Sequence, residues 1–229
     1  MIRRAATPDG VQSKEAADTF CRVYWYPLYG FLRSKGYGGA DAQDHVQSFL
    51  SQLVERGTIG KADPAKGQLR NYLMTLILRH ASSRHRSATT AKRGGGVPHL
   101  PMDWGAAEAG FQAECTVESE PEILFRRGLA VRLVEESALI LEAEFAKAGR
   151  RALFEALLPS LEGAMPDNSF AALGQSLGMS EGAVRVASCR LRERFRKCLR
   201  QIASQALGIP TGPGLDEELR QIFGLRAEK

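Results

Sequence analysis

The chain has 229 residues, enough for one ordinary domain or two small ones. Its composition, 44% hydrophobic and 25% charged, is that of a globular protein and excludes a wholly disordered, collagen-like or coiled-coil chain. The net charge is only +5, so the distribution of charge along the chain says more about partners than the sum does.

Helical periodicity is frequent in the sequence and long alternating runs are missing, so we predict an all-α fold. The first half is expected to form helices over residues 16–34, 41–56 and 68–86. Pro27 interrupts the first of these patterns and should kink or split that helix. Several glycines and Pro64 mark residues 57–67 as a loop. Together these segments predict a first domain over residues 11–86.

Residues 87–120 differ in character from the segments on either side. They show little periodicity and contain the run KRGGG at residues 92–96, followed by Pro98 and Pro101. Such a composition is typical of connections between domains, so we predict a flexible interdomain linker here.

The second half begins at Pro121, a favourable first residue of a helix. Helices are expected over residues 122–147, 150–161, 169–177 and 181–206. They predict a second domain over residues 121–208. An amphipathic pattern over residues 215–225 predicts a short helix within a C-terminal tail, residues 209–229, and we expect this helix to pack within the molecule.

Charge is unevenly distributed along the chain. Residues 64–102 contain seven basic residues and no acid, whereas residues 103–122 contain six acids and neither Lys nor Arg. Residues 185–200 contain seven basic residues against Glu193 alone. Two basic helices separated by an acidic stretch predict two nucleic-acid footprints, although either one alone fits a solvated charged face equally well.

The sharpest motif is a predicted helix-turn-helix over residues 169–197. Gly178 permits the turn, and Ser180 is a good N-cap for the second helix. The stripe that contains Val184 and Leu191, together with Ser188 and Phe195, should face the domain. The outward face and its flank suit the major groove of DNA, and we predict DNA contacts from Gly182, Arg185, Val186, Cys189, Arg190, Arg192 and Arg196. The alternative is an ordinary helical hairpin whose basic face is exposed to solvent.

Three segments resemble, in order, parts of bacterial RNA polymerase sigma factors. Residues 41–50, DAQDHVQSFL, resemble the second conserved helix of these proteins, and residues 67–73, GQLRNYL, resemble the start of the promoter-melting helix. Residues 173–199 resemble the helix-turn-helix of sigma domain four. The absence of intervening domains points to the extracytoplasmic-function (ECF) group. Residues 24–29, YWYPLY, and the KRGGG run are similar to an ECF-like set from planctomycete-type bacteria.

This resemblance implies two small helical domains, sigma domain two and sigma domain four, joined by the flexible linker. It also implies that core RNA polymerase docks on the polar face of the second helix, formed by Asp41, Asp44, Gln47, Ser48, Ser51 and Glu55. A solvated surface is the alternative for this face. Many ECF sigma factors carry Glu where this chain has Ser48, so phosphorylation of Ser48 or Ser51 is a hypothesis for supplying the missing charge.

The resemblance further implies that the third helix binds the melted non-template strand of promoter DNA near the minus-ten element. The expected contacts are Arg70, Tyr72, Arg79, Arg84 and Arg86. For Tyr72, which lies on the apolar stripe, a core position is the stronger alternative. The loop over residues 57–67 would receive a flipped base, and the linker would lie near the RNA-exit path of the polymerase, where its acidic part could mimic nucleic acid or be a disordered spacer.

The sequence therefore predicts an alternative sigma factor that binds core RNA polymerase and directs promoter-specific transcription initiation. The alternative is a stand-alone helix-turn-helix regulator that binds duplex DNA without polymerase. Whether an anti-sigma factor, a Ser/Thr kinase or the C-terminal tail regulates the protein is left open by the sequence.

Other classes of function receive little support. The chain contains no H-E-x-x-H or dinucleotide-binding motif, so we expect no catalytic residues, metal or cofactor. The four cysteines, Cys21, Cys115, Cys189 and Cys198, form no C-x-x-C pair and are expected to be free thiols in a reducing cytoplasm. No apolar run approaches the roughly 20 residues of a spanning helix, so we expect no membrane insertion.

Overall fold

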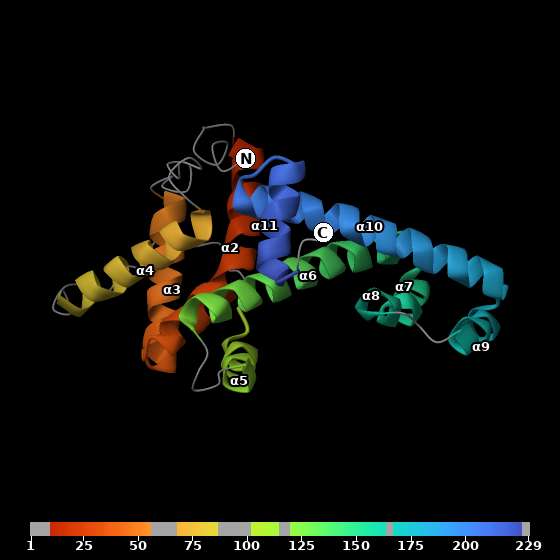
Figure 1. Cartoon of the computed structure of the whole chain (residues 1–229), viewed down its shortest axis with the longest axis horizontal. Helices are drawn as coiled ribbons and strands as arrows, with labels where there is room; N and C mark the ends of the chain where they lie inside the picture. Colours follow the sequence, from red (N-terminus) through yellow and green to blue (C-terminus); the bar gives the residue numbers. More distant parts are fainter. Residues whose placement is uncertain (1–9, 56–67, 87–101, 115–119, 164–166, 226–229) are drawn as a thin grey trace. The chain divides into compact units, whose positions relative to one another are not determined.

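The computed structural model describes residues 10–55, 68–86, 102–114, 120–163 and 167–225 (Figure 1). Within these ranges every regular element is a helix and no strand occurs, which confirms the all-α prediction for this part of the chain. The helices are α2 (Gly10–Ser34), α3 (Gly39–Glu55), α4 (Leu69–Arg86), α5 (Trp104–Glu114), α6 (Pro121–Lys147), α7 (Arg151–Leu157), α8 (Pro159–Glu162), α9 (Asp167–Leu177), α10 (Glu181–Leu207) and α11 (Pro213–Phe223).

Two prolines act differently from each other. Pro27 lies inside α2, which continues through it without being split. Proline has no backbone N–H, so one hydrogen bond of the helix is missing. Burial of the neighbouring Leu28 and Phe31, which are almost completely buried, offsets that loss. Pro159, by contrast, starts a new helix, so the single helix expected over residues 150–161 is divided into α7 and α8.

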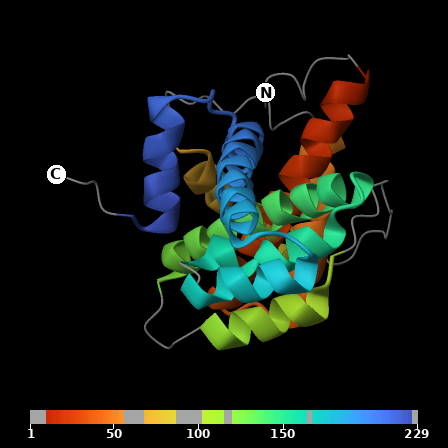
Figure 2. The same ribbon diagram turned by 90° about the vertical axis from the view of Figure 1, so that its right-hand side faces the viewer.

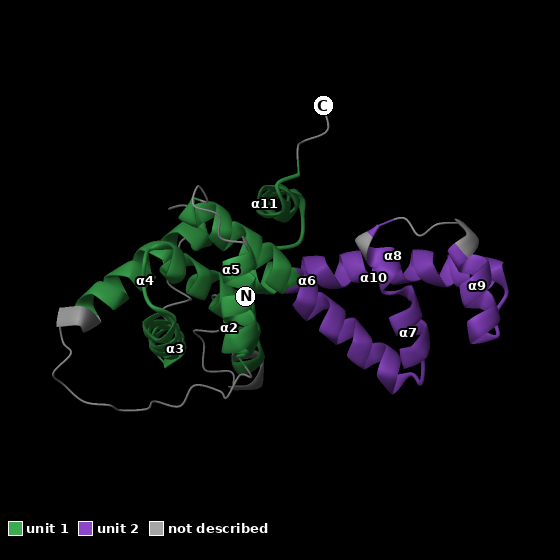
Figure 3. Cartoon of the chain, turned by 90° about the horizontal axis from the view of Figure 1, so that it is seen from below, with its two compact units in different colours: residues 1–133, 203–229 green, residues 134–202 purple. Residues whose placement is uncertain are grey.

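The helices group into two compact units, shown in different colours in Figure 3. Unit 1 comprises residues 1–133 and 203–229, and unit 2 comprises residues 134–202. The boundaries between the units lie inside α6 and α10. They therefore differ from the predicted boundaries at residues 86, 120 and 208, and the functional division into sigma domains stays a prediction.

The core of unit 1 explains why the start of α6 belongs to it. Helix α2 packs against α3, α4 and α5. From α6, the fully buried ring of Phe125 lies 6.4 Å from the ring of Tyr24 and 6.2 Å from that of Phe31. Burying an aromatic side chain of this size contributes about 2 kcal/mol. The apolar face of the first half of α6 is thus covered by α2.

Helix α5 lies within the stretch expected to be a flexible linker, and that expectation is corrected for residues 102–114. The carboxylate of Asp103 caps the helix by accepting a hydrogen bond from the N–H of Ala106 at 2.9 Å. The ring of Trp104 lies 5.2 Å from that of Trp25 and 5.4 Å from that of Tyr29. The spacing of Trp104, Ala107 and Phe111, all on one helical face, was the signal for this helix.

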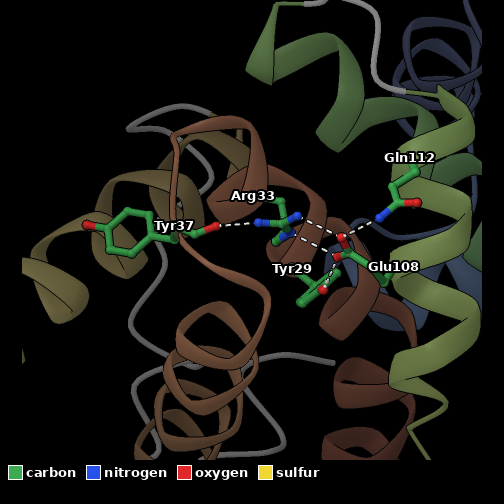
Figure 4. A network of polar contacts seen from close by, with 5 residues as sticks. All are labelled: Tyr29, Arg33, Tyr37, Glu108 and Gln112. Carbon is green, nitrogen blue, oxygen red and sulfur yellow. Dashed lines mark hydrogen bonds and ion pairs between the residues drawn. The ribbon is translucent and has the colours of Figure 1, made fainter.

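A polar network also holds α5 on α2 (Figure 4). The guanidinium of Arg33 donates to both carboxylate oxygens of Glu108, at 2.9 and 2.7 Å, and to the carbonyl of Tyr37 at 2.6 Å. The hydroxyl of Tyr29 and the amide of Gln112 donate to the same carboxylate. The hydrogen bonds from Arg33 are the largest cause that lowers the pKa of Glu108 from 4.5 to about 2.

Unit 2 has its own apolar core. It is formed by side chains from four helices, α6, α7, α9 and α10: Leu141, Phe145, Phe154, Leu157, Phe170, Val184 and Leu191. This core fixes one face of α10 and leaves the opposite face to solvent.

Candidate nucleic-acid interface

Helices α9 and α10 are joined by the three residues 178–180, where the sequence predicts the turn. Gly178 adopts a left-handed φ of +65°, which favours glycine. The hydroxyl of Ser180 accepts a hydrogen bond from the N–H of Ala183 at 3.2 Å, so the predicted N-cap is confirmed.

Gly174 shows how closely the turn folds back on α9. A Cβ atom at this position would lie 2.6 Å from the carbonyl oxygen of Met179, a distance that Cβ atoms essentially never show. Only glycine fits there without a shift of the backbone. The turn geometry thus depends on two glycines, Gly174 for space and Gly178 for conformation.

The inner stripe of α10 lies where the sequence predicts it. Val184, Ser188 and Leu191 are buried, and Phe195 is half-buried against the unit 2 core. On the outer side Gly182, Val186, Cys189 and Arg190 are all exposed. Val186 is 50% exposed. The predicted outward face therefore exists as one continuous exposed row.

The flanking arginines of α10 make different contacts. Arg185 forms an ion pair with Glu181 at 2.9 Å, and its guanidinium lies 4.7 Å from the centre of the Phe170 ring. Both partners of this pair stay more than 40% exposed, so Arg185 is held in place but open to solvent. Arg196 is also exposed and donates weakly to the carbonyl of Arg192 at 3.4 Å.

Arg192 has a structural role that the sequence did not reveal. Its guanidinium donates to the carbonyl oxygens of Ser160 at 2.8 Å and Gly163 at 3.2 Å. Carbonyls at the C-terminal end of a helix such as α8 lack partners within the helix, and an arginine satisfies them well. A DNA contact by Arg192 would compete with these bonds and stays a prediction.

The predicted contacts along α4 are described by the structure only in part. Arg79 is exposed. The side chain of Tyr72 is 38% exposed, so the core position favoured for it is wrong. The buried stripe of α4 runs instead through Leu73, Met74 and Ile77. Arg84 and Arg86 lie in the last turn of α4, and their side chains are outside the described part of the chain, as are the loop over residues 57–67 and the KRGGG run.

Arg70 is the exception, because it is neutralised within the protein. Its guanidinium donates to the carboxylate of Glu218 in α11 at 2.7 Å, and the two side chains are only 13% and 9% exposed. It also donates to the side-chain oxygen of Gln221 at 3.0 Å. Gln68 reinforces the contact by donating to Glu218 at 3.1 Å and to Gln221 at 2.8 Å. Sequence reasoning missed this cluster because its members are about 150 residues apart.

The polar face of α3 is present as predicted. Asp41, Asp44, Gln47 and Glu55 are exposed, whereas the opposite face of the helix is buried. Ser48 and Ser51 are half-buried and bonded within the protein. The hydroxyl of Ser48 lies 2.8 Å from Nε2 of His80 and donates to the carbonyl of His45, while Ser51 donates to the carbonyl of Gln47.

Cys21, Cys189 and Cys198 are free thiols, and burial raises the pKa of Cys21 to about 12, whereas Cys115 is outside the described ranges. Within the described ranges no group of three or more His, Cys, Asp or Glu side chains is placed to hold a metal ion. None of the described helices is long and apolar enough to cross a membrane.

Comparison of the chain with protein families, with curated proteins and with solved structures gives no match.

Proposed function

We propose that the chain is an alternative sigma factor of the ECF type, which binds core RNA polymerase and directs promoter-specific transcription initiation. The observation that carries the proposal is the exposed row on α10, Gly182, Val186, Cys189 and Arg190, presented by a tight turn from α9. Small residues near the start of such a helix allow close approach to the major groove, and arginines can read guanine edges or hold phosphates.

The amphipathic character of α3 supports the polymerase half of the proposal. Its buried face fixes the helix in unit 1, so the acidic row at Asp41, Asp44 and Glu55 has a constant spacing. An acidic row of fixed spacing suits a basic partner surface, for which charge complementarity sets register and association rate. In this proposal the chain performs no chemical step itself, and the polymerase supplies the catalysis.

The decisive experiment mixes the full-length chain with bacterial core RNA polymerase, measures binding, and then measures run-off transcription from a library of promoter-containing DNA. The proposal expects binding and initiation at specific sites. Asp44→Arg should weaken polymerase binding, whereas the same change at the exposed Glu15 of α2 serves as a matched control. Binding to DNA without association with polymerase would instead favour a stand-alone regulator.

Recognition by α10 is tested separately with two arginines of the same helix. Arg190 belongs to the outward row, whereas Arg194 is paired with Glu144 and lies over the Phe145 ring. Arg190→Ala should cost about 1–3 kcal/mol of binding free energy and relax the upstream promoter preference. Arg194→Ala should leave that preference unchanged. Equal effects of Arg190→Ala on all promoter sequences would remove Arg190 from the residues that read bases.

A further inference from the structure

Helix α11 belongs to unit 1 (Figure 2), and its side chains contact the start of α4. Pro213 stands at its start, and Gly224 ends it with a left-handed φ of +66°. Leu215, Leu219 and Ile222, spaced as one helical face, are buried. The helix is therefore anchored by an apolar stripe of three residues.

Helix α11 makes its polar contacts with residues at the start of α4. Glu218 is nearly as buried as the apolar stripe, and it faces Arg70, with Gln68 and Gln221 completing the cluster. The buried Tyr24 of α2 is close enough that Glu218 contributes, after burial itself, to raising the pKa of its hydroxyl. A buried carboxylate requires a cation beside it, so Arg70 is the residue that permits Glu218 to be there.

We infer that α11 is an internal competitor of nucleic acid, in which the Glu218 carboxylate occupies the guanidinium that a phosphate of the melted promoter strand would bind. This inference rests on the proposed function and on the expectation, drawn from the resemblance, that Arg70 contacts that strand. Carboxylate and phosphate are bound by the same donor fork of arginine, so the two ligands exclude each other at one side chain. Gln68 and Gln221 hold α11 in the competing position.

The competition has a thermodynamic signature. If α11 weakens binding of a strand by a given factor, the strand weakens docking of α11 by the same factor. Release of α11 requires the separation of one short helix with three buried apolar residues, while the core formed by α2, α3 and Phe125 stays intact. An α11 that served only to stabilise unit 1 would have no such link to nucleic acid.

The first test compares Glu218→Ala with Glu217→Ala in the full-length chain. Both variants lose one negative charge on the same helix, but Glu217 is exposed and paired with Arg220 on the outer side. The probe is fluorescently labelled single-stranded oligothymidine, titrated by anisotropy at low salt. Glu218→Ala should bind about 5-fold or more tightly than Glu217→Ala, the lower end of usual coupling between ligands. In an Arg70→Ala background the two substitutions should bind equally.

The second test uses the wild-type chain and so does not depend on the folding of a variant. Amide hydrogen exchange of residues 213–223 is measured with and without saturating oligothymidine, and exchange should increase when the strand is bound. Equal affinity of the two variants, with α11 still protected in the bound state, would overturn the inference and leave the proposed function standing. Absence of oligothymidine binding by every variant, together with no association with core polymerase, would overturn both.

Discussion

Two ion pairs of unit 1 and one ion pair of unit 2 differ in exposure. In unit 1, Arg33 and Arg70 pair with carboxylates from distant parts of the chain, Glu108 and Glu218, and all four side chains are less than one third exposed. In unit 2, Arg185 pairs with Glu181 one turn away, and both side chains are more than 40% exposed. A basic helix therefore does not by itself define a nucleic-acid surface, because the position of the neutralising acid decides whether its arginines are available.

The largest expected effect follows from removing the buried cation of unit 1. Arg70→Ala leaves the Glu218 carboxylate buried without its partner and should lower the free energy of unfolding by about 3 kcal/mol. Urea denaturation followed by circular dichroism measures this change. Arg79→Ala, at an exposed position of the same helix, is the control and should change stability by less than about 0.5 kcal/mol. A similarly small effect of Arg70→Ala would contradict the difference drawn between the less exposed and the more exposed ion pairs.

Substitutions at two glycines, Gly174 and Gly182, test whether packing rather than charge positions the outward face of α10 in unit 2. Gly174→Ala places a Cβ against the Met179 carbonyl and should destabilise the protein by about 1–3 kcal/mol. The same substitution at Gly182 meets nothing within 4 Å and should stabilise it by up to about 1 kcal/mol. Thermal unfolding of both variants gives the sign of each change in stability. Two changes of the same sign would contradict the tight turn.

The half-buried pair of Arg33 and Glu108 in unit 1 predicts a dependence on pH. Because the pKa of Glu108 is lower in the folded chain than its ordinary value of 4.5, its contribution to stability is complete above that value. The contribution is lost as the pH falls from about 4.5 toward about 2. Fluorescence of Trp25 and Trp104, the chain's two tryptophans, reports the docking of α5. In Glu108→Gln the acid-induced change should be much smaller, whereas Glu120→Gln, at an exposed site, should behave as wild type.

The smallest effect is expected for the exposed pair of unit 2. Arg185→Ala should lower the free energy of unfolding by less than about 1 kcal/mol, since ion pairs between exposed side chains contribute little. The measurement is again urea denaturation, at low and at high salt. A loss as large as that of Arg70→Ala would show that exposure does not determine how much these two ion pairs stabilise the fold.

Local signals predicted much of this fold. Capping residues, glycines and apolar spacing placed eight helical segments, and the stripe from Val184 to Phe195 faces inward as expected. These features depend on residues within a few positions of one another, which a sequence displays directly. Helix α5 was not predicted, because two glycines and a strong acidic bias made the helical spacing of Trp104 and Phe111 hard to recognise.

What could not be predicted depends on contacts between distant segments. No local pattern shows that Glu218 will meet Arg70, or that Arg192 will donate to the carbonyls of Ser160 and Gly163. Tyr72 illustrates the same limit, since the apolar stripe on which it lies favours a core position, whereas the packing of neighbouring helices leaves it exposed. The surroundings of three predicted DNA contacts, Arg70, Tyr72 and Arg192, thus depend on contacts that exist only in the folded chain.

The division of the units along the chain has a consequence for synthesis on the ribosome. Unit 2 is a continuous segment, residues 134–202, whereas unit 1 needs residues 203–225 to add the buried face of α11. Because a nascent chain emerges from its N-terminus and folds unit by unit, unit 2 can be complete while unit 1 still lacks a helix. During that interval Arg70 has no Glu218 beside it. We expect the nascent protein to expose a cation that the finished protein covers.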